Sequence, residues 1–136
     1  MGILEQLELD FDHDDVEKFL HFFRTMCDKL EPLIIDLGSD STKYKLAVLE
    51  IARLAHNTAW AARRLELSEV TDFCVFCEDM MEQAKRFEGP ASDEFTDWML
   101  LMSEQFEKYC RSYEEDASNL AVFNPLIVNV PSIVSK

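Results

Sequence analysis

The sequence predicts an all-α protein, folded as an up-down-up-down four-helix bundle with an extended apolar C-terminal tail. Only three glycines and four prolines occur in 136 residues, so long uninterrupted elements are expected. Apolar residues recur at helical 3-4 spacing in four long segments. Short polar connections join these segments, and helices joined in this way pack antiparallel to one another. The length and the 48% hydrophobic content suit one domain with a single core.

The first helix is expected over 14–37, with Asp14 and Glu17 resembling a capping box and Gly38 ending the helix. The second is expected over 42–65, capped by Ser41 or Thr42. The inward residues of the first helix are expected to be Val16, Phe19, Leu20, Phe23, Met26, Cys27, Leu30, Leu33, Ile34 and Leu37. Those of the second are Ala47, Ile51, Leu54 or Ala55, Thr58, Ala62 and Leu65, a stripe that excludes His56.

The third helix is expected over 69–87 with Ser68 as its cap, and the fourth from Ser92 or Asp93 to about Ala117. Gly89-Pro90 separates them. The inner face of the third helix comprises Val70, Phe73, Cys74, Cys77, Met80, Met81, Ala84 and Phe87. That of the fourth comprises Phe95, Trp98, Met99, Met102, Phe106, Tyr109, Cys110 and Tyr113. The domain organisation is therefore a leader over 1–13, a bundle over 14–117 and a tail over 118–136.

The tail is rich in β-branched residues, carries two prolines and is nearly uncharged. It is a poor helix former, and its apolar side chains should not remain in water. We expect it to lie extended along the bundle or against a second subunit, which would make the protein a homodimer.

The net charge of −14 argues against binding to nucleic acid or to an anionic membrane surface. No run approaches the roughly 18 apolar residues of a membrane helix. The first residues lack the basic start and apolar core of a signal peptide. These features predict a cytoplasmic protein whose four cysteines are thiols.

His56 is the main candidate functional residue. It lies in a stretch that reads as helix throughout, and the small residues Ala52 and Ala59 stand one turn to either side. Residues three or four apart share a helix face, so the surface around His56 is expected to be flat enough for another protein to approach. An imidazole in this setting is suited to act as a nucleophile or to carry a phosphoryl group.

The segment Ile51-Ala52-Arg53-Leu54-Ala55-His56 resembles the lead-in to the phosphorylated histidine of the histidine-containing phosphotransfer (HPt) domain family, including the phosphotransfer domain of chemotaxis histidine kinases. Leu65-Glu66-Leu67, Val70, Phe73 and Cys77-Glu78-Asp79-Met80-Met81 resemble the turn and third helix that follow in the family. The resemblance implies a four-helix bundle in which His56 accepts a phosphoryl group from a response-regulator receiver domain or a histidine kinase.

The family usually has lysine three residues and glycine four residues after the histidine, where this chain has Ala59 and Trp60. Arg53 and Arg63 are the charge partners that could replace the lysine. Ala52, Ala59 and Trp60 would form the docking surface. For Trp60 the alternatives are an interface contact, since tryptophan is enriched at binding hot spots, or a site covered by the tail.

Other constellations carry weaker signals. His13, Glu17 and His21 have metal-ligand spacing but lie off the apolar stripe, which favours a solvated face. Cys74 and Cys77 lie on a core stripe, where buried cysteines behave as small hydrophobes. Asp10, Asp12 and Asp14 lack the glycine of a calcium loop, and favour a role at the start of the first helix. We therefore expect neither a metal site nor a cofactor.

The sequence thus predicts a non-enzymatic module of a two-component phosphorelay with His56 as its phosphoryl acceptor. The alternative is a degenerate phosphotransfer-like bundle that acts only in protein interaction or dimerisation.

Overall fold

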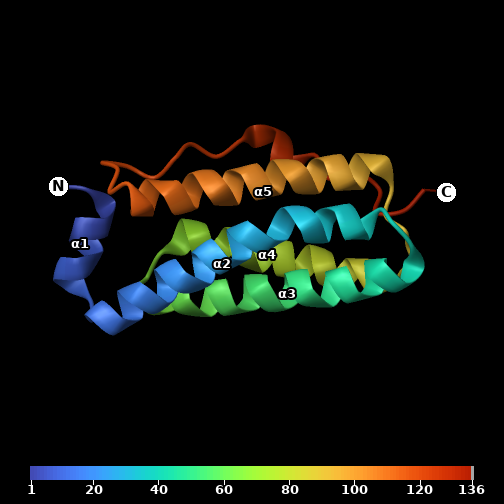
Figure 1. Ribbon diagram of the computed structural model, residues 1–136. Helices are drawn as coiled ribbons and strands as arrows, with labels where there is room; N and C mark the ends of the chain where they lie inside the picture. The colour runs from blue at the N-terminus through green and yellow to red at the C-terminus, as the bar shows by residue number, and fades with distance from the viewer. Residues whose placement is uncertain (136) are drawn as a thin grey trace.

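The computed structural model describes residues 1–135, and every regular element among them is helical (Figure 1). Five α-helices and one 3₁₀ turn follow in order. They are α1 (Ile3–Asp10), α2 (His13–Leu37), α3 (Ser41–Arg64), α4 (Ser68–Ala84), α5 (Asp93–Glu114) and η1 (Pro125–Val128). The four expected helices are present, with ends that differ by up to three residues. The short helix α1 in the leader was not expected.

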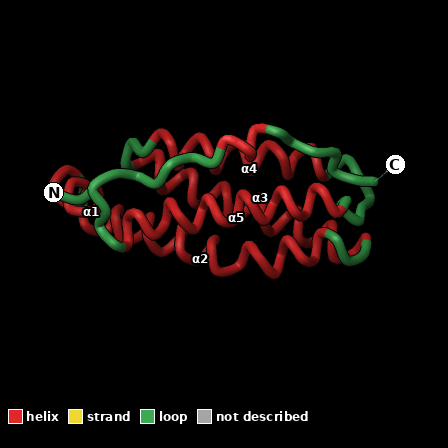
Figure 2. The backbone as a smooth tube through the Cα atoms, turned by 90° about the horizontal axis from the view of Figure 1, so that it is seen from above, coloured by secondary structure: helices red, strands yellow, loops and turns green. Residues whose placement is uncertain are grey.

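The four long helices lie side by side in an elongated, bundle-like arrangement (Figures 1 and 2). Helix α3 packs against α2 and α4, and α2 packs against α5. The expected inward residues fill the space between them, except that Leu20 and Leu33 are only partly buried and Phe87 lies beyond the end of α4 and is exposed. Within residues 1–135, no helix is both long and apolar enough to cross a bilayer.

The helix starts differ from the local motifs read in the sequence. Helix α2 begins at His13, and its N-cap Asp12 makes no side-chain capping bond, so the Asp14 capping box is wrong. Asp40 caps α3 by accepting from the Lys43 amide at 2.8 Å. Helix α4 begins at Ser68 itself, without a side-chain cap. Helix α5 begins at Asp93, one of the two expected starts, and Ser92 Oγ caps it by accepting from the Phe95 amide at 3.0 Å.

Helix α1 is held by residues that follow the C-terminal end of α5. Asp116, just beyond α5, accepts from the backbone amides of Leu4 and Glu5 at 3.0 and 3.1 Å. The Ile3 amide donates to the Ala117 carbonyl at 2.8 Å, and Leu7 is buried. A carboxylate at a helix N-terminus satisfies free amides and favours the helix dipole. The leader is therefore part of the packed structure.

The tail runs back along α5 and is bonded to a row of its polar side chains. Ser112 Oγ accepts from the Ala121 amide, and Trp98 Nε1 donates to the Ile127 carbonyl at 2.8 Å. Gln105 is buried and bonds to the tail twice, to the Val122 carbonyl and from the Asn124 amide. Ser92 bonds to the carbonyls of Ser132 and Ile133. These contacts, spaced six or seven residues apart on α5, fix the path of the tail.

Only part of the tail's apolar surface is buried. Ile127 and Ile133 are 0% and 8% exposed, whereas Leu126, Val128 and Val130 are exposed. The expectation that all of these side chains leave water is therefore wrong. The tail lies along its own chain, which is the first of the two packing alternatives.

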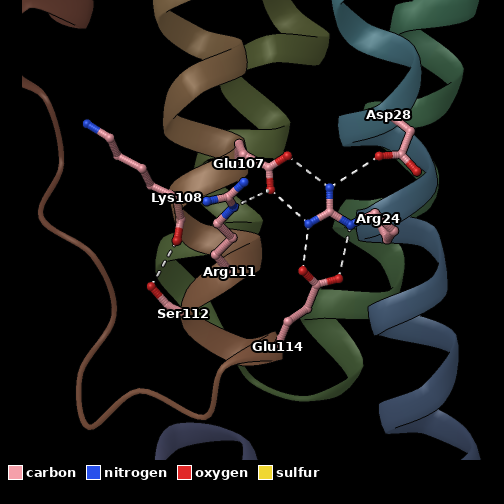
Figure 3. A network of polar contacts seen from close by, with 7 residues as sticks. All are labelled: Arg24, Asp28, Glu107, Lys108, Arg111, Ser112 and Glu114. Carbon is pink, nitrogen blue, oxygen red and sulfur yellow. Dashed lines mark hydrogen bonds and ion pairs between the residues drawn. The ribbon is translucent and has the colours of Figure 1, made fainter.

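Helices α2 and α5 are also joined by an ion-pair network around Arg24 (Figure 3). The guanidinium donates to both carboxylate oxygens of Glu107 at 2.9 and 2.8 Å, and to those of Glu114 at 3.0 and 2.6 Å. Asp28 accepts a further bond at 3.2 Å. The hydrogen bonds to Arg24 hold the pKa of Glu107 and of Glu114 below their usual range.

We expect Arg24→Gln to lower the free energy of unfolding by about 1–2 kcal/mol near neutral pH, allowing for solvent screening of this half-exposed network. Because the two glutamate pKa values are lowered by folding, their contribution is present above the ordinary glutamate value, roughly 4.3. It is lost as the pH falls through the lowered values. Urea unfolding of both proteins between about pH 7 and about pH 3 should therefore show the difference shrinking in acid.

Lys85→Gln is the matched control, because the one ion pair of Lys85 within residues 1–135 is an exposed pair with Glu82. It should change stability little. A difference between wild type and Arg24→Gln that is independent of pH would contradict the ion-pair role of the network.

Candidate functional site

His56 lies at the middle of α3 on the side away from the core. Its side chain is 66% exposed, and Nδ1 lies 3.0 Å from Glu78 Oε2 on α4. No other hydrogen bond of the ring is formed within residues 1–135. The one contact therefore uses Nδ1, and Nε2 has no partner in the described part of the chain.

This contact determines how the imidazole can react. An ionised carboxylate only accepts hydrogen bonds, so Nδ1 must carry the proton in the contact with Glu78. The neutral ring then has its lone pair on Nε2. A carboxylate bonded to one ring nitrogen fixes the tautomer and stabilises positive charge that develops when the other nitrogen reacts. The arrangement presents Nε2 as a nucleophile at the surface.

Glu78 belongs to the segment that resembles the third helix of the HPt family, but its contact with His56 was not predicted from the sequence. The connection between α3 and α4 covers only 65–67, and the two helices pack along each other. In such an antiparallel pair, residues equally far from the connection face each other. His56 lies about as many residues before the connection as Glu78 lies after it. This similar spacing was the signal in the sequence that could have identified Glu78 as the neighbour of His56.

The two proposed charge partners have different surroundings. Arg53 is exposed one turn before His56, and its Nε donates to Glu50 at 2.9 Å. Arg63 is exposed at the end of α3 and forms no ion pair with the residues of 1–135. Arg64, which was not among the predicted charge partners, lies 5.2 Å from the centre of the Trp60 ring and contacts Asp15 of α2 at 3.4 Å.

Of the three expected docking residues, Trp60 is exposed and Ala52 is half-buried, but Ala59 is only 2% exposed. The assignment of Ala59 to the docking surface is therefore wrong. The Ala59 side chain belongs to the buried core cluster, where its small size allows close packing. The tail lies along α5 and does not cover Trp60, whose 45% exposure leaves the ring open to a partner.

The exposed face of α3 extends well beyond His56. Leu46 and Leu49 are 64% and 55% exposed, and with Arg53, His56 and Trp60 they follow a continuous 3-4-3-4 spacing along the helix. This is the spacing by which a helix packs against a partner. Helix α3 also carries five basic residues and only one acidic residue, in a chain of net charge −14. Neither this stripe nor the basic character of α3 was predicted from the sequence.

The structure also places the other candidate residues, the histidine and glutamate pair of α2 and the two cysteines of α4. His13 Nε2 lies 3.0 Å from Glu17 Oε1 at the exposed surface of α2, and no group of three or more potential ligands that could hold a metal ion occurs within residues 1–135. Cys74 and Cys77 are fully buried, as expected for core residues. Burial raises the pKa of both thiols, that of Cys77 to about 12, so neither is reactive near neutral pH.

No protein-family model, curated protein or solved structure matches this chain. The candidate site therefore rests on the residues and geometry described above.

Proposed function

We propose that the four long helices form a four-helix bundle of the phosphotransfer type, and that the protein is a non-enzymatic signalling module of a two-component phosphorelay. His56 accepts a phosphoryl group on Nε2 and passes it on. The observation that carries this proposal is the contact between His56 Nδ1 and Glu78, which leaves Nε2 of the exposed ring without a partner among residues 1–135.

In the proposed step, the Nε2 lone pair attacks the phosphorus of an aspartyl phosphate on a receiver domain. The phosphorus–oxygen bond to that aspartate breaks, and the aspartate leaves as a carboxylate. The imidazole becomes a phosphohistidine whose Nδ1–H remains bonded to Glu78. The receiver supplies Mg²⁺ and most of the transition-state stabilisation. Transfer from a histidine kinase follows the same course, with the kinase phosphohistidine as the donor.

The face of α3 supports recognition of such a partner. The active site of a receiver is rich in carboxylates, and the basic residues of α3, with Arg53 and Arg63 nearest to His56, complement it in charge. Ala52 and Trp60 contribute the surface around the histidine, and the exposed leucines extend it along the helix. We place the protein in the cytoplasm, where these partners act.

The proposal is tested by incubating the protein with phosphorylated receiver domains and active histidine kinases from its organism. Transfer should produce a label on the protein that is labile in acid and stable in base, as expected for a phosphohistidine. Binding of each partner is measured in parallel by calorimetry. A partner that binds tightly without transferring its phosphoryl group would contradict the relay and favour the alternative, an interaction or dimerisation module.

Trp60 is expected to limit transfer, since it stands one turn after His56 where the family usually has glycine. Trp60→Gly should raise the transfer rate from a receiver and cost about 1 kcal/mol in stability relative to alanine. Trp60→Ala is the matched control, because it removes the ring without the helix penalty and should raise the rate similarly. If both variants leave rate and partner affinity unchanged, Trp60 lies outside the docking surface.

A further inference from the structure

A cavity of about 430 Å³ opens between α4, α5 and the tail, on a surface that is separate from the face of α3. Four aromatic side chains line it, from three different segments. Phe73 and Phe76 come from α4, Tyr109 from α5 and Phe123 from the tail. Glu69 and Asp72, both exposed, stand at its edge on α4. The volume falls within the range of sites for small molecules.

Phe73 packs edge-to-face against two of the other aromatic rings. Phe73 meets Phe123 at an interplanar angle of 88° with ring centres 5.5 Å apart. It meets Tyr109 at 78° with ring centres 6.0 Å apart. These rings, together with Phe76, border the same open cavity. Aromatic faces carry negative potential, so several rings around one cavity favour a cation.

The charge of the surrounding helices favours the same class of ligand. Helix α4 carries five acidic residues and no basic residue. The carboxylate of Glu69 lies close enough to raise the pKa of Tyr109, in addition to the larger effect of burial. An anionic ligand would be repelled here, and a neutral apolar ligand would gain nothing from the carboxylates.

We propose that this cavity binds a small organic cation, with a quaternary or alkylated ammonium group held among Phe73, Tyr109 and Phe123 and its charge balanced by Glu69 and Asp72. The aromatic rings contact the alkyl groups and attract the charge. The carboxylates at the edge add selectivity over uncharged molecules of the same shape.

The tail completes the site. Phe123 is held in place by its neighbours, because the Asn124 amide donates to Gln105 Oε1 at 2.7 Å and Trp98 Nε1 donates to the Ile127 carbonyl at 2.8 Å. The cavity wall that Phe123 forms is therefore fixed before any ligand binds, which lowers the entropic cost of binding.

Choline is a suitable probe, and its uncharged carbon isostere, in which a tert-butyl group replaces the trimethylammonium group, is the matched control ligand. Titration of the full chain, followed by residue-resolved NMR, should give saturable shifts at Phe73, Tyr109 and Phe123 with choline. The isostere should bind about five-fold more weakly or worse. Equal binding of the two ligands, no saturable shift, or shifts confined to other residues would overturn the proposal.

Charge-removing variants provide a second test that does not disturb the core, since both carboxylates are exposed. Glu69→Gln and Asp72→Asn should each weaken choline binding about two- to five-fold and leave binding of the isostere unchanged. Asp79→Asn and Glu82→Gln remove charges from the same helix outside the cavity and should have smaller effects. Equal losses in all four variants would show a general charge effect and contradict a defined site. None of these outcomes depends on His56.

Discussion

Deletion of 124–136 is expected to lower the free energy of unfolding by at least about 3 kcal/mol, roughly 10 °C in Tm. The deletion removes Ile127 and Ile133, the two tail side chains that are buried in the core. It also removes the carbonyl that accepts from Trp98 Nε1 and the amide that donates to the buried Gln105. Buried polar groups that lose their partners add to the cost of the exposed apolar surface.

Two single substitutions distinguish the stability lost with one buried tail side chain from the stability lost when the whole segment is removed. Ile127→Ala should cost about 2–5 kcal/mol, because its side chain is fully buried. Val128→Ala, at the next position and 68% exposed, should cost less than about 0.5 kcal/mol. Light scattering should give the same mass for the full and truncated chains. A halved mass would show that the tail joins two subunits, and unchanged stability would show that it contributes nothing to the fold.

Replacement of His56 by Gln is expected to abolish phosphorylation by every partner, because the amide side chain has no nucleophilic nitrogen lone pair. The side chain is exposed and makes one hydrogen bond within residues 1–135, so helicity and Tm should hardly change. The chain provides its own controls, since His13 and His21 are its other two histidines and both are exposed on α2. His13→Gln and His21→Gln should retain full labelling.

Glu78→Gln tests the positioning role of the carboxylate. The amide keeps the shape of the side chain but removes the charge that stabilises the developing imidazolium, so the rate of phosphoryl transfer should fall about ten-fold. Partner affinity should remain unchanged, which separates positioning from docking. Label that persists in His56→Gln would contradict the assignment of the acceptor, whatever the effect of Glu78→Gln.

Patterns of side-chain burial within a helix were predictable from the sequence, because the inward stripe depends on spacing alone. The stripes of α4 and α5 are buried as expected, apart from Phe87. The position of His56 outside the stripe of α3 was predictable for the same reason. Ala59 was misassigned because an alanine fits either a close helix contact or an open surface, and its own side chain does not distinguish them.

Contacts between distant parts of the chain were not predictable from local motifs. The cap of α1 comes from Asp116, which is 112 residues from Leu4. The path of the tail depends on polar side chains of α5, among them Gln105, which shares the inward face of Trp98, Met102 and Tyr109 but whose polarity gave no sign of burial. The partner of His56 required the register of α3 against α4. In each case the determining residue lies on another element, and a single sequence does not state which elements meet.

The most direct test of His56 as a phosphoryl acceptor needs no partner. The purified protein is treated with phosphoramidate, a small donor of phosphoryl groups to histidine, and examined by phosphorus NMR with nitrogen-labelled protein. We predict one acid-labile phosphohistidine, attached through Nε2 of His56 and absent from His56→Gln. Modification at Nδ1, equal modification of all three histidines, or no modification of His56 would contradict it.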